Sequence, residues 1–205
     1  GVQTLVRETE VAAGTAIYVN CQTLGEDGEP VLPDEPVEAT LQTAPVASFG
    51  TPDSDDPLVV MPVRTGLVTI TCALPALGLI DATPAEVIVR QGRPHTVITS
   101  ISPSVITAGE QVTATCDVFD AFENPIENPR VTLRVAPESS AIRIGGLTAT
   151  VERAGLFTAT CEVRGALETF ADTFEALPAL PSTLAIGLEP NQRVYQVGQV
   201  SNVVP

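Results

Sequence analysis

The sequence predicts an all-β protein that consists of two tandem domains. The chain is 44% hydrophobic, with no Trp, two Tyr and six Phe, so we expect an aliphatic core rich in β-branched residues, which favour pleated sheets. Eighteen Pro and fifteen Gly are scattered between short apolar runs, a distribution that indicates many turns and no long helix. An internal repeat with two cysteines in each copy predicts two domains within the 205 residues.

The repeat is clearest in residues 102–126, which have the pattern of a turn, an alternating strand with a central cysteine, and a second turn. A glycine precedes the cysteine and a proline follows it at the same distances in both copies. The matched residues are Gly14, Cys21 and Pro30 in the first copy and Gly109, Cys116 and Pro125 in the second. We therefore predict one domain over 1–91, a second over 92–178, and a partial third repeat or C-terminal strand segment over 179–205.

Each copy has a second cysteine, Cys72 or Cys161, preceded in both cases by the pattern Gly-Leu-x-Thr-x-Thr. Four cysteines allow three pairings, and the repeat selects Cys21 with Cys72 and Cys116 with Cys161. A metal site is the competing interpretation, but the chain has no Cys-x-x-Cys pair, and its single histidine, His95, is far from every cysteine in sequence. Paired disulfides indicate an oxidising compartment.

In the first domain, the turn Ala13-Gly14 separates a first strand from a second, and apolar residues alternate with polar ones from Ile17 to Gln22, as in a half-buried strand. An acidic turn follows at 24–30. We expect further strands at 37–43, 58–63, 66–74 and 86–90, with loops at 51–57 and 75–84.

The linker 91–94 is short and contains Pro94, so we expect the two domains to sit in a semi-fixed, end-to-end arrangement. The second domain repeats the plan of the first. Its strands are expected near 96–101, 111–119, 130–135, 141–144, 147–152, 156–163 and 169–176. Beyond it, residues 180–186 resemble 93–99, which is the basis for the predicted third repeat.

Residues 118–126, Val-Phe-Asp-Ala-Phe-Glu-Asn-Pro-Ile, resemble a turn of the bacterial immunoglobulin-like (Ig-like) tandem repeats found in invasin- and intimin-type surface proteins. Residues 92–94, followed by a strand, resemble the junction between such repeats. The resemblance implies tandem Ig-like β-sandwiches with one disulfide per domain, in a secreted or cell-surface bacterial protein. It covers the second domain well, whereas a different, acidic sequence at 25–31 replaces the motif in the first.

The turn also has a physical logic of its own. Asp120 can accept hydrogen bonds from backbone N–H groups two residues on, and Pro125 fixes φ at the start of the next segment. Glu123 stands where the family has glycine. If this position requires a positive φ, the glutamate is strained by about 1 kcal/mol or more. Alternatively, Asn124 takes the left-handed conformation, which Asn tolerates better.

The net charge of −15 argues against nucleic acid as a partner, because nucleic-acid binding draws on clustered basic charge. No apolar run is long enough to span a bilayer, and no signal peptide is recognisable, so we expect no membrane insertion and expect Gly1 to begin a mature chain or an excised fragment. Asp53, Asp55 and Asp56 have the spacing of oxygen ligands for Ca²⁺, with a plain solvated loop as the alternative. No other cofactor is indicated.

No pattern in the sequence predicts catalysis, so we do not expect an enzyme. His95 follows the linker without a recognisable nucleophile or orienting partner, and we expect an exposed or interface histidine there. Residues 180–184 differ from a sortase motif because Leu184 stands in place of the required glycine.

We expect a structural or adhesive module, a stalk or spacer whose partners are other domains of the same chain. One alternative is a filament subunit, in which residues 183–203 pair as strands with a neighbouring copy. Another is a binding module whose acidic loops 25–29 and 51–57 contact a protein or glycan. Such a module would expose aromatic residues together at one end, whereas a spacer has no large exposed apolar patch. The aromatic candidates are Tyr18, Phe49, Phe119, Phe122 and Tyr195.

Overall fold

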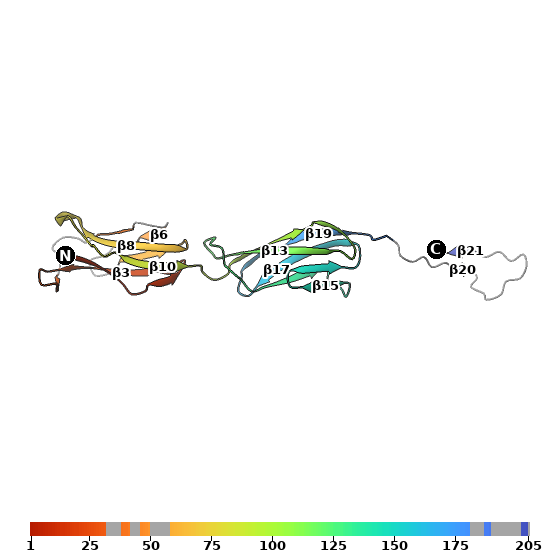
Figure 1. The fold of residues 1–205 in the computed structure, drawn as a ribbon, viewed down its shortest axis with the longest axis horizontal. Coiled ribbons are helices and arrows are strands. Elements are labelled where there is room, and N and C mark those ends of the chain that lie inside the picture. Colours follow the sequence, from red (N-terminus) through yellow and green to blue (C-terminus); the bar gives the residue numbers. More distant parts are fainter. Residues whose placement is uncertain (32–37, 42–45, 50–57, 181–186, 190–201, 205) are drawn as a thin grey trace, which may run out of the picture.

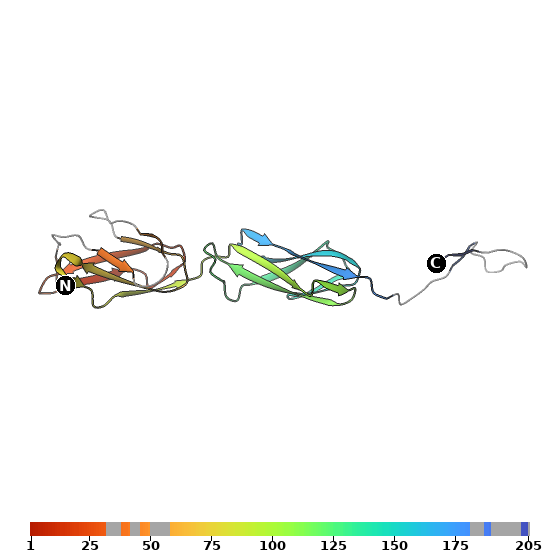
Figure 2. The ribbon, with the colours of Figure 1, turned by 90° about the horizontal axis from the view of Figure 1, so that it is seen from above.

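A computed structural model shows two β-sandwiches joined end to end by a short linker (Figures 1 and 2). It describes residues 1–31, 38–41, 46–49, 58–180, 187–189 and 202–204. The predicted fold class, tandem Ig-like sandwiches with one disulfide each, is confirmed.

The described residues of domain 1 form two sheets of five strands each. In the first, the strand order is β1-β3-β7-β6, with β4 beside β3; the strands are β1 (Val2–Val6), β3 (Ile17–Leu24), β4 (Pro30–Val31), β6 (Val46–Phe49) and β7 (Leu58–Pro62). In the second, the order is β2-β10-β8-β5, with β9 beside β8; the strands are β2 (Glu10–Ala12), β5 (Glu38–Leu41), β8 (Gly66–Leu74), β9 (Leu79–Ile80) and β10 (Ala85–Arg90). A 3-10 helix, Pro75–Leu77, lies between β8 and β9.

Domain 2 repeats the order of the four main strands in each sheet and adds one further strand to the first sheet. One sheet has the order β15-β16-β13-β11-β18, built from β11 (Thr96–Ser102), β13 (Gln111–Phe119), β15 (Ile142–Gly145), β16 (Thr148–Val151) and β18 (Glu168–Phe170). The other has the order β12-β19-β17-β14, built from β12 (Val105–Thr107), β14 (Val131–Ala136), β17 (Gly155–Val163) and β19 (Asp172–Leu177). A separate hairpin pairs β20 (Gly187–Glu189) with β21 (Asn202–Val204), while the predicted third repeat stays a prediction.

The alternation of side chains along the strands explains both cores. In β3, Ile17 and Val19 are buried whereas Tyr18 and Asn20 are exposed, so every second residue faces the opposite sheet. Disulfides join Cys21 to Cys72 and Cys116 to Cys161, linking β3 to β8 and β13 to β17 across the two sheets of each domain. These are the pairings that the repeat selects.

The buried residues described for domain 1 form an aliphatic core, as predicted. Domain 2 departs from the prediction, because Phe157 and Phe174 are both buried and stack with their ring centroids 5.4 Å apart. They come from adjacent strands, β17 and β19, at directly paired positions. Cross-strand pairing therefore allows two of the few aromatic residues to fill the centre of this sandwich.

A buried threonine in each domain ties the first strand to the second-cysteine strand. The Thr4 hydroxyl accepts the N–H of Cys72, and the Thr99 hydroxyl accepts the N–H of Cys161, each at 2.9 Å. Asp81 accepts the N–H of Thr4 at 2.5 Å in domain 1. These bonds satisfy polar groups that would otherwise be buried without partners.

The predicted long strands match the structure to within one or two residues. The three-residue strands β2 and β12 were not predicted; they run parallel to β10 and β19 respectively and are too short to show a period of two. The predicted strand at 169–176 is interrupted at Ala171, which separates β18 from β19. In the part of the chain that is described, no helix has the length and apolar character needed to cross a membrane.

Candidate functional site at the domain junction

The turn Asp120–Asn124, at the end of β13, lies where domain 2 meets domain 1 and is closed by its own first side chain. The Asp120 carboxylate accepts the N–H groups of Phe122 and Asn124, each at 2.9 Å, and the backbone N–H of Asp120 donates to Asn124 O at 3.0 Å. Both Asp120 and Asn124 are buried. The predicted role of Asp120 in tightening the turn is therefore seen in the geometry.

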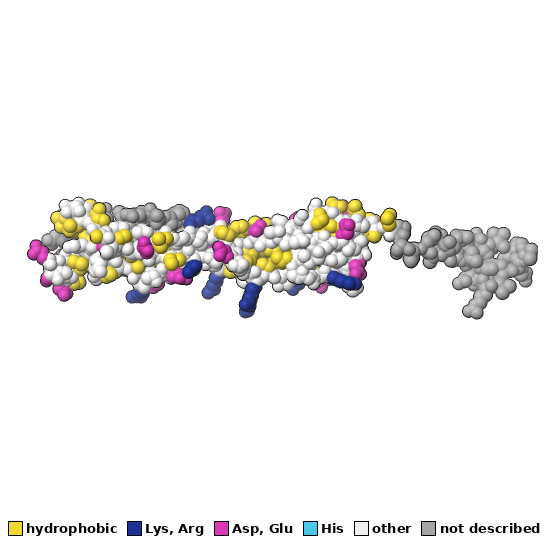
Figure 3. All heavy atoms as spheres, viewed as in Figure 1, with side chains coloured by type: hydrophobic (Ala, Val, Ile, Leu, Met, Phe, Trp, Pro, Cys, Tyr) yellow, Lys and Arg dark blue, Asp and Glu magenta, His cyan; other side chains and the backbone are white. Residues whose placement is uncertain are grey.

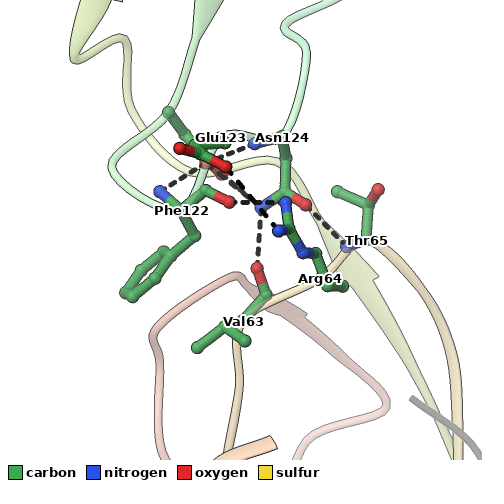
Figure 4. A network of polar contacts seen from close by, with 7 residues as sticks. Val63, Arg64, Thr65, Phe122, Glu123 and Asn124 are labelled. Carbon is green, nitrogen blue, oxygen red and sulfur yellow. Dashed lines mark hydrogen bonds and ion pairs between the residues drawn. The ribbon is translucent and has the colours of Figure 1, made fainter. Parts of the chain in front are cut away.

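The Asn124 side chain connects this turn to domain 1 (Figure 4). Its Nδ2 donates to Val63 O at 2.8 Å, and its Oδ1 accepts the N–H of Thr65 at 3.1 Å. The same Nδ2 also lies 2.9 Å from the Asp120 carboxylate, which fixes the orientation of the amide. Because Val63 and Thr65 contribute only backbone atoms, the contact depends on the path of the β7–β8 turn and not on its side chains.

The linker is held by the other carboxylate oxygen. The backbone N–H of Gly92 donates to Asp120 Oδ2 at 2.7 Å. Burial by itself would raise the pKa of Asp120, but hydrogen bonds from Gly92, Asn124 and Phe122 together outweigh it and lower the pKa below its ordinary value. Asp120 is therefore a charged group whose ionised form organises the turn and the linker together.

Phe122 is the apolar part of the contact. Its ring packs against the core of domain 1 and lies over Gly14, where a Cβ atom would be 2.5 Å from the ring Cζ. The Gly14 N–H donates to Pro62 O at 2.7 Å, and φ at Gly14 is 78°. Glycine is therefore required at position 14 both for its conformation and for the room it leaves for the ring.

Glu123 takes the left-handed conformation, with φ of 63°, whereas Asn124 does not. The first of the two predicted alternatives is thus the observed one. Arg64 of domain 1 donates to Phe122 O at 2.8 Å, and its guanidinium lies 3.8 Å from the Glu123 carboxylate. Since the Arg64 and Glu123 side chains are 47% and 87% exposed, this ion pair stabilises the junction little.

Of the other predicted site residues, His95 lies at the junction, where it lines a cavity together with Asp120 and Phe122. Asp53, Asp55 and Asp56 lie outside the described residues, so the calcium site stays a prediction. His95 is half-buried beside the linker, with its Nδ1 3.1 Å from the Thr96 hydroxyl, and its backbone carbonyl accepts the N–H groups of Leu167 and Glu168. Within the described residues, no cluster of metal-ligating side chains occurs.

Of the aromatic residues considered for a binding surface, only some belong to the described part of the chain. Tyr18 is 52% exposed on β3, and Phe122 is used at the junction. The side chains of Phe49 and Tyr195 lie outside the described part of the chain. The junction contacts themselves were missed by sequence reasoning, although the motif 118–126 that supplies them was recognised.

Comparisons with known proteins place the fold. No protein-family model matches the sequence, and no curated protein matches it in a sequence search. The structure is similar to that of FdeC, an Escherichia coli adhesin, over 92% of this chain and 67% of that chain, with a TM-score of 0.59 and 15% identity. It is also similar to invasin, a bacterial integrin-binding protein, over 86% of this chain and 40% of that chain, with a TM-score of 0.55 and 16% identity.

At these identities the similarity establishes the fold. The chain has the architecture of the tandem Ig-like domains of invasin-type bacterial adhesins, in agreement with the resemblance of residues 118–126. It spans two fifths of the length of the invasin chain, so it corresponds to a part of that protein.

Proposed function

We propose that this chain is a spacer segment of an extracellular or cell-surface adhesive protein, in which two Ig-like domains act as one stiff unit. The observation that carries the proposal is the turn Asp120–Asn124, whose Asp120 and Asn124 side chains bind the linker and domain 1 at the same time. The similarity to an adhesin and to an integrin-binding protein supports the adhesive context.

Domains joined by a short linker move relative to one another unless their interface resists it. Here the polar contacts are part-buried and involve the buried Asn124 side chain, where a lost partner costs about 1–3 kcal/mol, and the Phe122 ring packs against the core of domain 1 beside them. A hinge motion at the linker would break the bonds from Asn124 and Gly92 together. We therefore infer a fixed angle between the domains, which is what a spacer needs in order to present another domain at a defined distance.

Residual dipolar couplings measured by NMR test this proposal directly. If the unit is stiff, one alignment tensor fits the amides of both domains. The Asn124→Ala variant should need two tensors and lose about 2–3 kcal/mol of stability, because Val63 O and Thr65 N–H lose their partner. Asn20→Ala, at an exposed position on β3, is the matched control and should change neither. Two independent tensors in the unchanged chain would show that the domains are not a spacer of fixed length.

A second function, direct binding of a protein ligand, is favoured by the outer end of domain 1. There Leu77 and Ile80 are 65% and 69% exposed, at the end of the domain that also carries the acidic turn 25–29. Figure 3 shows hydrophobic side chains at this outer end. An apolar centre with a polar rim is typical of protein interfaces.

Adhesion of coated beads to cultured epithelial cells tests this second function. We expect the double variant Leu77→Asp/Ile80→Asp to lose adhesion, whereas Leu167→Asp, which changes an exposed leucine of domain 2, keeps it. Equal adhesion of both variants would remove the outer end of domain 1 as the binding surface.

A further inference from the structure

The end of domain 2 that faces away from domain 1, here called the distal end, repeats the surface that receives the Asp120 turn on domain 1. In domain 1, Ala13 N–H donates to Arg90 O at 2.8 Å and Gly14 N–H donates to Pro62 O at 2.7 Å. In domain 2, Ala108 N–H donates to Leu177 O at 2.8 Å and Gly109 N–H donates to Val151 O at 2.7 Å. Ala13 therefore matches Ala108, and Gly14 matches Gly109. Their acceptors match as well, Pro62 with Val151 and Arg90 with Leu177.

The following turn is repeated as well. Arg64-Thr65-Gly66 leads into β8, and Arg153-Ala154-Gly155 leads into β17. Both glycines have extended positive φ values, 137° and 152°. The two turns differ at Val63 and Thr65, which correspond to Glu152 and Ala154 in domain 2. Val63 and Thr65 bind the Asn124 side chain through backbone atoms only, so the contact does not depend on their side chains. The one side chain of this turn that donates across the junction is an arginine, and it is retained as Arg153.

In domain 2 this surface is open. A Cβ atom at Gly109 would meet nothing within 4 Å, whereas at Gly14 it would meet the Phe122 ring. Arg153 is exposed, and within the described part of the chain neither its side chain nor the N–H of Ala154 has a hydrogen-bonding partner. The neighbouring Leu156 and Leu177 are 69% and 44% exposed.

We propose that the distal end of domain 2 docks a third module of the same polypeptide, one whose turn has the form Asp-x-Phe-x-Asn. The phenyl ring covers Gly109, the asparagine amide pairs with the backbone of Glu152 and Ala154, and Arg153 binds the carbonyl of the phenylalanine. The proposal rests on the junction contacts used above for the proposed function. The occupant is placed on the same chain because residues 180–186 repeat the sequence pattern with which domain 2 begins.

A second copy of the chain does not fit this surface through its own first domain. The turn of domain 1 that corresponds to Asp120, Phe122 and Asn124 has Gly25, Asp27 and Glu29 at those positions. It offers neither a ring for Gly109 nor an amide for the backbone of Ala154. The turn of domain 2 in a second copy is already occupied by its own domain 1.

The test adds a module with the required turn. The chain through Leu177 is continued by a second copy of residues 91–178, because Leu177 O occupies the place of Arg90 O at the first junction. Domain 2 has its own core and disulfide, so the added copy can be checked for folding by its disulfide and amide spectrum. Amide hydrogen exchange of Ala154, followed by NMR, is the readout, and the N–H of Thr65 is the internal reference.

We expect the Ala154 N–H to exchange at least about tenfold more slowly in the extended chain than in residues 1–205, since it gains an acceptor. In the extended chain, Gly109→Ala and Arg153→Glu in domain 2 should abolish this protection. Arg164→Glu, which changes an exposed arginine near the opposite end of domain 2, should keep it. Phe122→Ala in the added copy alone should also abolish it.

If the Ala154 N–H exchanges equally fast in the extended chain and in residues 1–205 while the Thr65 N–H is protected from exchange, the docking proposal is overturned and the proposed function stands. Exposure of Thr65 as well would show that the first junction is not fixed, and both proposals would fall. Protection of Ala154 that appears in residues 1–205 and grows with concentration would overturn it in favour of a second copy as the occupant.

Discussion

The Phe122 ring of domain 2 lies over Gly14 of domain 1, so close that position 14 has no room for a β-carbon. Gly109 has the equivalent place in domain 2, with a positive φ of 100° and open space around it. The two glycines share a backbone requirement and differ in what covers them. Comparing substitutions at the two glycines therefore separates the free-energy cost of a side chain at positive φ from the cost of losing the contact with Phe122.

We therefore expect Gly14→Ala to be more harmful than Gly109→Ala. Each variant pays about 1 kcal/mol for an alanine at positive φ. Only Gly14→Ala also displaces Phe122, at a further cost of about 1–2 kcal/mol for the apolar area returned to water. Denaturant unfolding measures the stability, and dipolar couplings report the domain orientation. Equal effects of the two variants would mean that the ring contact contributes nothing.

Replacing Glu123 with glycine, the residue that the family has at this position, should stabilise the chain. Its φ of 63° strains a glutamate, and its ion pair with Arg64 is exposed to solvent. Glu123→Gly should stabilise the chain by about 0.5–1 kcal/mol, with the relief of strain partly offset by the greater freedom of glycine in the unfolded state.

Glu123→Gln is the matched variant, because it removes the charge and keeps the strain. Thermal unfolding should show almost no change for this substitution, as surface ion pairs contribute little. A loss of stability in both variants would mean that the contact with Arg64 outweighs the backbone strain.

The sandwiches could be predicted from the sequence because their signals are local or repeated. The alternation around Ile17 and the matched positions of Cys21 and Cys116 lie within single strands or recur at fixed spacing. The stacking of Phe157 on Phe174 could not be predicted, since it depends on the register between β17 and β19.

The contact between the two domains could not be predicted from the sequence for a related reason. The contact between Phe122 and Gly14 joins two turns in different domains, and no periodic pattern connects them. The sequence did contain one signal, an Asp-x-Phe-x-Asn turn in the second repeat only, at 120–124. This motif supplies the contact that the second copy makes with the first.

The calcium site predicted at Asp53, Asp55 and Asp56 can be tested by thermal unfolding with Ca²⁺ and with a chelator. A site with a dissociation constant of about 0.1 mM would add about 1.4 kcal/mol at 1 mM Ca²⁺, a shift of several degrees for a domain of this size. The triple variant with Asn at all three positions should lose the shift. Asp27→Asn, in the other acidic turn, is the control, and a shift that survives in the triple variant would place the ion elsewhere.

The chain of residues 1–205 should be monomeric. The contact that joins its domains needs a phenylalanine and an asparagine in the turn, and domain 1 has Asp27 and Glu29 at those positions. Size-exclusion chromatography with light scattering should give one mass over a wide concentration range, unchanged by deletion of 180–205. Oligomers that disappear on this deletion would instead favour the filament alternative, in which the C-terminal segment pairs with a neighbouring copy.

Acid should weaken the junction before it unfolds the domains' cores. The pKa of Asp120 is lowered: burial alone would raise it, and the hydrogen bonds from Gly92, Asn124 and Phe122 more than compensate. A carboxyl with a depressed folded-state pKa contributes stability that is fully present above its unfolded pKa, about 3.9, and that is lost as the pH falls through the folded value. Stability and the common alignment of the domains should therefore decline together below about pH 4.

Asp120→Asn identifies the group responsible. This variant should be less stable at neutral pH, because an amide accepts hydrogen bonds more weakly than a carboxylate and its own N–H₂ group faces the Asn124 amide. It should also lose part of the pH dependence. Part of the remainder belongs to Asp81: burial alone would raise its pKa, but hydrogen bonds from Thr4 and Thr83 outweigh this effect and lower it. An acid transition that is the same in the variant and in the unchanged chain would assign all of it to Asp81 and the other carboxylates, and the Asp120 charge would then have no part in holding the domains together.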